Sequence, residues 1–193
     1  MKKILLVGNG AREHVIAETF KRSPQGCELY VFASANNPGL KALASGYRLT
    51  KSLNDFEALK SFANEIKPDF AFIGPDAQVV AGAVDALLEL GIKSASPSKK
   101  MGQLEGSKSF TRELVAKYGI DASPKFKVFT NESGLREFIE ELQHYVVKAD
   151  GLTGGKGVKV SGEHLQNTEE GYAYALECLS VDGRVVIEEK LIG

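Results

Sequence analysis

Short apolar runs alternate with amphipathic helical patterns along the first hundred residues, and no other feature constrains the possible folds as strongly. Residues 4–7, 29–32 and 70–73 form apolar runs of strand length. Between two of them, residues 53–66 place apolar side chains at three- and four-residue steps, as one face of a helix does. Strands that alternate with helices pair in parallel, with helices on both faces of the sheet. The sequence therefore predicts an α/β fold with an open, mainly parallel sheet.

Local signals predict where several elements of this region begin and end. We expect Ser52 to cap the helix over residues 53–66, because Asp55 follows it at capping-box spacing. Residues 79–88 are expected to form one helix, closed by Gly91. A further short strand is expected over residues 92–95.

After about residue 103 the regular alternation of strand and helix patterns ends, and a hairpin pattern appears. It predicts a small α+β module with an antiparallel sheet. Its expected elements are a helix over 107–118, a strand over 125–129, a helix capped by Thr130, a hairpin over 146–160, a helix over 168–179 and a strand over 184–189. We therefore expect two domains, residues 1–103 and 104–193, the second with a lid subdomain over about residues 124–187.

A glycine-rich loop joins the two strands of the expected hairpin. The first strand ends on Lys148, and the loop contains Lys156. Glycines present bare amide groups to a ligand, and the lysines supply positive charge at separate points. This combination predicts a mobile lid that covers the phosphates of a nucleotide. The spacing is not that of a Walker loop, and the alternative is an ordinary hairpin with solvated lysines. The four glycines are Gly151, Gly154, Gly155 and Gly157.

The turn after the first strand has the sequence Gly8-Asn9-Gly10-Ala11-Arg12-Glu13-His14. It lies where a helix begins at the carboxyl edge of a parallel sheet, the usual place for a ligand. A helix N-terminus with glycines and Arg12 favours a phosphate group; the alternative is a tight turn with a solvated arginine. Glu13 stands where a dinucleotide fingerprint has its third glycine, and no acidic residue follows the second strand, which argues against NAD.

Two more polar loops follow strands on the same edge of the expected sheet. One contains Asn37-Pro38-Gly39, and the other is Gly74-Pro75-Asp76-Ala77. Together the three loops predict a crevice, in which Asp76 could accept hydrogen bonds from an amine or a hydroxyl. Each loop taken alone has only the composition of a turn.

Two segments of the second region could complete a nucleotide site. Lys108 lies in the first turn of a helix, where the helix dipole disfavours a cation. A lysine that binds a ligand is therefore favoured over one that is merely solvated at the surface. Backbone groups of residues 187–191 could bond the edge of an adenine, with Leu191 over its face. The alternative for this segment is a charged edge strand.

Composition excludes several classes of function. A net charge of -1 gives no electrostatic case for nucleic acid or for an anionic membrane surface. No apolar run approaches the roughly 20 residues that span a bilayer. Cys27 and Cys178 lack metal-site spacing and are expected to be buried thiols in a reducing cytoplasm. The three histidines form no pair at metal-binding spacing.

Taken together, six strings resemble those of the phosphoribosylamine–glycine ligases, an ATP-grasp family of purine biosynthesis also called glycinamide ribonucleotide synthetases. They occur in family order and cover essentially the whole chain. Ala11 replaces a common glycine and Asp76 a common glutamate, while residues 37–39 look like a variant of a Pro-Gly-Asn loop. The strings are Gly8-Asn9-Gly10-Ala11-Arg12-Glu13-His14, Gly74-Pro75-Asp76-Ala77, Gln103-Leu104-Glu105-Gly106-Ser107-Lys108, Lys148-Ala149-Asp150-Gly151-Leu152, Gly155-Lys156-Gly157-Val158 and Val186-Ile187-Glu188-Glu189.

The resemblance implies a Rossmann-like, pre-ATP-grasp first domain and a small ATP-grasp lid. It implies a cytoplasmic ligase that joins glycine to 5-phosphoribosylamine through glycyl phosphate, using ATP with Mg²⁺ or Mn²⁺. The residues expected to bind ATP are Lys108, Lys148, Gly154, Gly155, Lys156, Gly157, Glu188, Glu189 and Leu191. Those expected to bind phosphoribosylamine are Gly8, Asn9, Gly10, Arg12, Glu13, Asn37, Pro38, Gly39, Gly74, Pro75 and Asp76.

Family members run to roughly twice this length, so the resemblance also implies that the chain is a fragment with a truncated ATP-grasp core. The metal ligands, the glycine site and the catalytic groups are then expected beyond residue 193, in a C-terminal part that would be a partner of this chain. No catalytic residue can be assigned here, and we expect the chain alone to be inert. The alternatives are a non-catalytic module for nucleotides or sugar phosphates and another ATP-grasp carboxylate–amine ligase.

Overall fold

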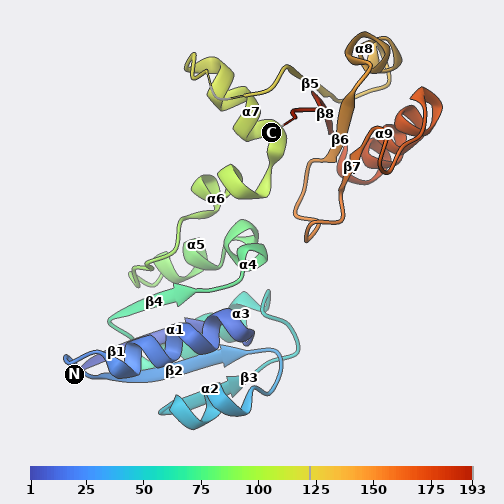
Figure 1. Cartoon of the computed structure of the whole chain (residues 1–193). Coiled ribbons are helices and arrows are strands. Elements are labelled where there is room, and N and C mark those ends of the chain that lie inside the picture. Colours follow the sequence, from blue (N-terminus) through green and yellow to red (C-terminus); the bar gives the residue numbers. More distant parts are fainter. Residues whose placement is uncertain (122, 193) are drawn as a thin grey trace. The chain divides into compact units, whose positions relative to one another are not determined.

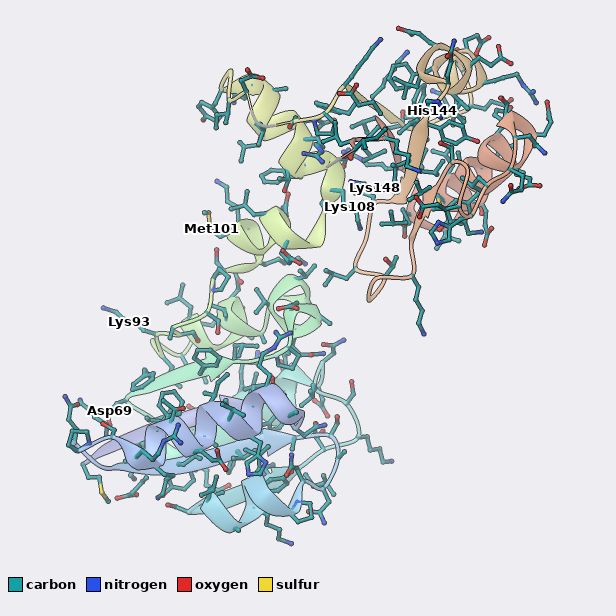
Figure 2. All side chains as sticks on the ribbon, viewed as in Figure 1. Asp69, Lys93, Met101, Lys108, His144 and Lys148 are labelled. Carbon is teal, nitrogen blue, oxygen red and sulfur yellow. The ribbon has the colours of Figure 1, made fainter. Side chains whose placement is uncertain are left out.

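The computed structural model describes residues 1–121 and 123–192. Ala122 and Gly193, the last residue of the expected second domain, lie outside the described residues. The chain forms two compact units, Met1–Gly102 and Gln103–Gly193. Both are traced in Figure 1 and drawn with their side chains in Figure 2.

The first unit is built on a four-stranded sheet in which every pair of neighbouring strands is parallel. The strand order is β3-β2-β1-β4, with Leu6 of β1 opposite Val31 on one side and Phe72 on the other. The parallel sheet predicted from the sequence is confirmed. Its strands are β1 (Lys2–Val7), β2 (Cys27–Ala33), β3 (Gly46–Leu49) and β4 (Phe70–Ile73).

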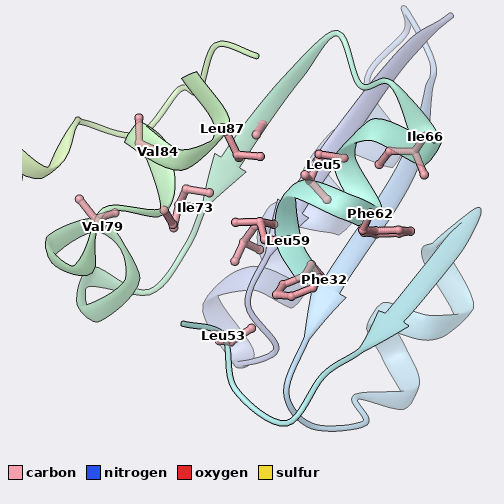
Figure 3. Packing of buried hydrophobic residues seen from close by; sticks show 14 residues of the cluster. Leu5, Phe32, Leu53, Leu59, Phe62, Ile66, Ile73, Val79, Val84 and Leu87 are labelled. Atoms are coloured by element: carbon pink, nitrogen blue, oxygen red, sulfur yellow. The ribbon is translucent and has the colours of Figure 1, made fainter. Parts of the chain in front are cut away.

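Successive side chains of β1 point to opposite faces of this sheet, and each face has its own core. Leu5 and Val7 pack with apolar residues of three helices, as Figure 3 shows. Ile4 and Leu6 pack in a second cluster, with residues of the two remaining helices. Helices therefore cover both faces, as the alternation of apolar runs predicts. The first group is α3 (Phe56–Ile66), α4 (Asp76–Ala81) and α5 (Ala83–Leu88), and the second is α1 (Ala11–Arg22) and α2 (Pro38–Leu43).

Three local predictions for this unit are wrong. Residues 79–88 are not one helix, because Gly82 adopts a φ of 110° and separates α4 from α5. Residues 92–95 form no strand but a single parallel bridge to β4, after which the Ser96 hydroxyl bonds both the amide and the carbonyl of Ile73 at 2.8 Å. Asp55, not Ser52, caps α3, since its carboxylate accepts the Ala58 amide at 3.0 Å.

The second unit is built on an antiparallel sheet, as predicted, and its strand order is β5-β8-β6-β7. Val147 and Ile187 point to one face and pack there with the helices α8 and α9. Thr130 does not cap α8, because Gly134 with a φ of 73° precedes it. The strands are β5 (Phe126–Phe129), β6 (Tyr145–Ala149), β7 (Val158–Val160) and β8 (Val185–Glu189), and the helices are α7 (Lys108–Lys117), α8 (Leu135–Leu142) and α9 (Thr168–Asp182). The helix α6 (Lys99–Gly106) contains the boundary between the two units.

The remaining features of the described residues concern the two cysteines and the length and polarity of the helices. Cys27 and Cys178 are both buried and both carry free thiols. Within residues 1–121 and 123–192, no helix is both long and apolar enough to cross a membrane.

Candidate ligand sites in the two units

In the first unit, the turn between β1 and α1 is organised around a buried carboxylate. Glu13 is only 4% exposed, and its Oε2 accepts a hydrogen bond from the Gly10 amide at 2.6 Å. A Cβ atom on Gly8 would lie 2.6 Å from Glu13 Cγ, and one on Gly74 would overlap the Glu13 carboxylate. Gly8, Gly74 and Glu13, all predicted to bind a ligand, thus have a structural role. The two glycines make room for Glu13, whose side chain packs between two loops.

Arg12 connects the same turn to the loop after β4. Its Nη1 donates to the Gly74 carbonyl and to Asp76 Oδ1, both at 3.1 Å. Both side chains are largely exposed, so the ion pair is open to exchange with a ligand. The structure therefore brings Arg12 and Asp76 together, with Pro75 beside them at the start of α4.

Asn9 and Asn37 join the loops that follow β1 and β2. Asn9 Oδ1 accepts from the Ser34 amide at 3.0 Å, and Asn37 Nδ2 donates to the Asn9 carbonyl at 3.1 Å. Pro38 and Gly39 were predicted to lie in a loop, and this prediction is wrong: they are the first residues of α2. Asn37 caps this helix, because its side chain accepts a hydrogen bond from the amide of residue 40. The three polar segments thus meet at the carboxyl edge of β1, β2 and β4.

A Cβ atom on Gly39 would collide with the ring of His14. This glycine therefore allows α1 and α2 to approach closely, a packing role that the sequence pattern does not reveal. Among the eleven residues predicted for this site, the side chains of Arg12 and Asp76 are the charged groups that remain exposed.

In the second unit, Lys148 and Glu188 lie on the sheet face opposite the one packed against α8 and α9. Lys148 stands opposite Val186 and Glu188 opposite Val146, so the two are diagonal neighbours on adjacent strands. Lys148 Nζ lies 2.5 Å from Glu188 Oε2. Glu188 is 2% exposed, which makes it one of the few buried charged groups of the chain.

A third charged residue completes this cluster. Arg112 of α7 binds the same carboxylate with two nitrogens, Nε to Oε1 at 2.6 Å and Nη2 to Oε2 at 3.1 Å. Burial alone would raise the pKa of the Glu188 carboxyl, but hydrogen bonds and charge from Arg112 and Lys148 outweigh it and hold that pKa below its ordinary value. The sequence gives no sign of a role for Arg112, because nothing local links it to a residue 76 positions later.

Lys108 meets the root of the glycine-rich hairpin. Its Nζ donates to the Gly151 carbonyl at 2.9 Å, while the Asp150 carboxylate accepts from the Ser109 amide at 2.6 Å and from the Ser107 hydroxyl at 2.9 Å. The structure therefore places Lys108 and Lys148 beside the same end of the hairpin, where Figure 2 labels both.

The loop itself divides into a fixed part and a tip. Thr153 Oγ1 accepts from the Gly157 amide at 3.0 Å, and a Cβ atom on Gly157 would lie 2.5 Å from that oxygen. At the tip, Gly154 and Gly155 have φ values of 58° and 82°, which glycine adopts without strain. Lys156 is exposed beside them. The mobility of this tip in the absence of a ligand stays a prediction.

In the segment expected to hold an adenine, the side chain of Glu189 is hydrogen-bonded and that of Leu191 is exposed. The Glu189 carboxylate accepts from the Lys125 amide at 2.7 Å, and the backbone ladder ends where the Lys190 amide donates to the His144 carbonyl at 3.0 Å. Leu191 follows this last bond and is 67% exposed. Its side chain is therefore accessible to a ligand, while that of Glu189 is engaged by the backbone of the neighbouring segment.

The acidic residues and histidines do not suggest a metal centre. Within the part of the chain that the structure describes, no three His, Cys, Asp or Glu side chains lie together as a metal site requires.

The fold of the chain is similar to that of solved synthetases and ligases. N5-carboxyaminoimidazole ribonucleotide synthetase, solved as an ADP complex, matches it with a TM-score of 0.77 at 18% identity, over 98% of this chain and 47% of that one. D-alanine–D-alanine ligase from Bacillus anthracis matches with a TM-score of 0.69 at 16% identity, over 100% of this chain and 59% of that one. At such identities the likeness concerns the fold alone.

Two family models identify the chain more closely. The phosphoribosylglycinamide synthetase N domain matches residues 2–105, and the ATP-grasp (A) domain of the same synthetase matches residues 106–193. The chain belongs to the phosphoribosylglycinamide synthetase family, which confirms the resemblance noted in the sequence.

Relatives named phosphoribosylamine–glycine ligase support this assignment. The protein from Methanosarcina barkeri is 43% identical over 99% of this chain, and the one from Pyrococcus furiosus is 44% identical over 100% of it. The crystal structure of the Thermotoga maritima ligase matches with a TM-score of 0.74 at 30% identity over 99% of this chain. This chain spans about 44% of the length of each of these three relatives.

Proposed function

We propose that this chain is part of the machinery that joins glycine to 5-phosphoribosylamine at the expense of ATP, giving glycinamide ribonucleotide, ADP and phosphate. The observation that supports the proposal is the position of two lysines at the root of a glycine-rich hairpin, Lys148 near the end of β6 and Lys108 on the Gly151 carbonyl, in a chain matched by this family along residues 2–193. Two cations beside bare backbone amides suit a polyphosphate.

The reaction that we propose has two steps. A carboxylate oxygen of glycine attacks the γ-phosphorus of ATP, the bond from that phosphorus to the β–γ bridging oxygen breaks, and ADP leaves with the electron pair. The amine nitrogen of phosphoribosylamine then attacks the acyl carbon of glycyl phosphate. The bond from that carbon to the phosphate oxygen breaks, inorganic phosphate leaves, and the nitrogen loses one proton as the amide forms.

We assign the nucleotide to the second unit. Lys108, Lys148 and Lys156 would neutralise the charge that develops along the triphosphate, since fixed cations stabilise such charge most in a site that excludes water. The hairpin tip, with Gly154, Gly155 and Gly157, would close over the phosphates and protect glycyl phosphate from hydrolysis. Residues 188–191 would hold the adenine through their backbone groups and Leu191.

We assign phosphoribosylamine to the first unit, at the carboxyl edge of its parallel sheet. Arg12 would bind the phosphate group, because its guanidinium presents several donors and its partner Asp76 is exposed and exchangeable. Asp76 would then be free to accept a hydrogen bond from the sugar or the amine. Asn9 and Asn37 hold the loops of this edge together.

The metal ion of this proposal, Mg²⁺ or Mn²⁺, would screen the triphosphate when bound. We place the reaction in the cytoplasm, a proposal supported by the two buried free thiols, which suit a reducing compartment.

The test is ADP release by the protein expressed from its complete reading frame. Continued ADP release should require ATP, glycine and phosphoribosylamine together, and glycinamide ribonucleotide should accumulate in equal amount. Nucleotide binding without glycine-dependent ADP release would favour the non-catalytic module. Turnover with a different amine in place of phosphoribosylamine would favour another ATP-grasp ligase.

A further inference from the structure

Arg112 holds the buried carboxylate of Glu188 in one orientation. Its Nε and Nη2 atoms bind the two oxygens of Glu188, at 2.6 and 3.1 Å, in the parallel arrangement that the planar guanidinium favours. A third nitrogen, Nη1, lies 3.3 Å from the Ser123 hydroxyl, so the guanidinium is itself fixed from a second direction. A carboxylate held at both oxygens cannot rotate without breaking both bonds.

The position of Lys148 depends on that carboxylate. Glu188 Oε2 accepts from Arg112 Nη2 and, at 2.5 Å, from Lys148 Nζ. The side chains of Arg112 and Lys148 are each 22% exposed, so both lie against the sheet rather than in open solvent. The orientation set by Arg112 therefore passes through Glu188 to the ammonium group of Lys148.

Arg112 also sets the sign of the local charge. Arg112 and Lys148 carry two positive charges and Glu188 one negative charge, so the cluster has a net charge of +1. Without Arg112, Lys148 and Glu188 would neutralise one another, and the ammonium would offer a phosphate little net attraction. Arg112 therefore adds a positive charge at a place where Lys148 alone would be neutralised by Glu188.

We propose that Arg112 is a positioning residue of the nucleotide site, which orients Lys148 through Glu188 and keeps the cluster cationic for the triphosphate. The inference rests on the proposed function, since it takes the ligand of Lys148 to be ATP. A merely structural role, in which Arg112 only ties α7 to β8, makes a different prediction: its loss would lower stability and would affect every ligand of the folded unit alike.

Adenosine and a non-hydrolysable ATP analogue distinguish these roles by calorimetry on the full chain. In Arg112→Gln, the affinity for the ATP analogue should fall about tenfold or more, because a charge-assisted bond network is lost, while that for adenosine should not change. Arg112→Lys keeps the charge but not the two parallel bonds, so it should fold like the wild type and recover only part of the ATP affinity. Lys117→Gln removes a charge from the same helix and should change neither affinity.

Three results would overturn the inference. In the first, Arg112→Gln binds the ATP analogue as tightly as the wild type, or loses ATP and adenosine affinity equally; the proposed function survives either result. In the second, Arg112→Lys binds the ATP analogue as tightly as the wild type, which would show that charge alone suffices and that orientation plays no part. In the third, the wild type binds neither ligand, which would also remove the nucleotide site from the proposed function.

Discussion

Asp150 at the root of the glycine-rich hairpin supplies a second cap, in addition to the N-cap Ser107, to the helix that carries Lys108: its Oδ1 atom lies 2.6 Å from the backbone nitrogen of Ser109. The same carboxylate accepts from the Ser107 hydroxyl at 2.9 Å, while the amide of Lys108 donates to the Asp150 carbonyl at 3.3 Å. The N-terminus of α7 and the end of β6 are therefore fixed to one another. This contact holds Lys108 at the root of the hairpin, which follows Lys148 in the chain.

Asp150→Ala removes this cap and should lower the free energy of unfolding of the second unit by about 1 kcal/mol. It should also weaken ATP binding, because Lys108 loses its fixed position. Asp150→Asn keeps an acceptor oxygen and should lose less on both counts. Urea denaturation and calorimetry measure the two effects. Equal loss in both variants would show that the charge of Asp150, rather than its cap, is what matters.

The Thr153–Gly157 contact predicts a difference between two glycine substitutions in one loop. Gly157→Ala would press a methyl group against Thr153 and should destabilise the loop by about 1–3 kcal/mol. Gly151→Ala is the matched control, since its added carbon would lie 3.6 Å from Asp182, an ordinary contact. Combining Gly157→Ala with Thr153→Gly should relieve the clash. Indistinguishable thermal unfolding of both single variants would contradict this account of the loop.

Arg12→Ala should abolish most of the calorimetric signal for ribose 5-phosphate, because the proposed site then lacks its exposed cation. Arg22→Ala, at the other end of α1, removes the same charge away from the sheet edge and should leave the signal unchanged. Asp76→Asn should retain binding, since it removes the carboxylate that competes with the phosphate for Arg12. Unchanged affinity in Arg12→Ala would exclude this residue from the site.

The lowered pKa of Glu188 predicts how its contribution to stability depends on pH. A carboxyl whose pKa is lower in the folded than in the unfolded chain stabilises the fold above its unfolded value, about 4.3, and this stabilisation is lost as the pH falls through the folded value. Glu188→Gln leaves two cations unpaired and should cost about 3 kcal/mol at pH 7.

The comparison of wild type with Glu188→Gln isolates this residue from the other carboxyl groups. The difference in their free energies of unfolding should be constant from neutral pH down to the unfolded pKa and should shrink below it. A difference that grows as the pH falls would mean that the ion pairs do not stabilise the charged form.

The sequence predicted the parts of this fold that local patterns determine. The apolar runs at 70–73 and 146–148 are strands because period and composition suffice there. The third strand of the parallel sheet escaped notice, since Gly46-Tyr47-Arg48-Leu49 is short and only partly buried. The break at Gly82 also went unpredicted, because an isolated glycine in a helical pattern does not reveal its φ.

The candidate sites divide in the same way. The glycines of both sites, Arg12 of the first and the lysines of the second carry a local signal, and they lie at the carboxyl edge of the parallel sheet and at the hairpin. The partners of these residues carry none: Arg112 reaches Glu188, and Glu13 fills the space beside Gly74, only because the fold brings distant segments together. A single sequence does not record such pairings, so the clusters that orient Lys148 and shape the first turn became visible only in three dimensions.

The central claim is that a chain of this family phosphorylates glycine before it forms the amide, and isotope transfer tests it most directly. The protein expressed from its complete reading frame is given ATP, phosphoribosylamine and glycine labelled with ¹⁸O in its carboxylate. We predict that each phosphate released carries one ¹⁸O atom from glycine, because the acyl carbon–oxygen bond breaks when the amine attacks glycyl phosphate. Release of unlabelled phosphate while glycinamide ribonucleotide accumulates would contradict the account.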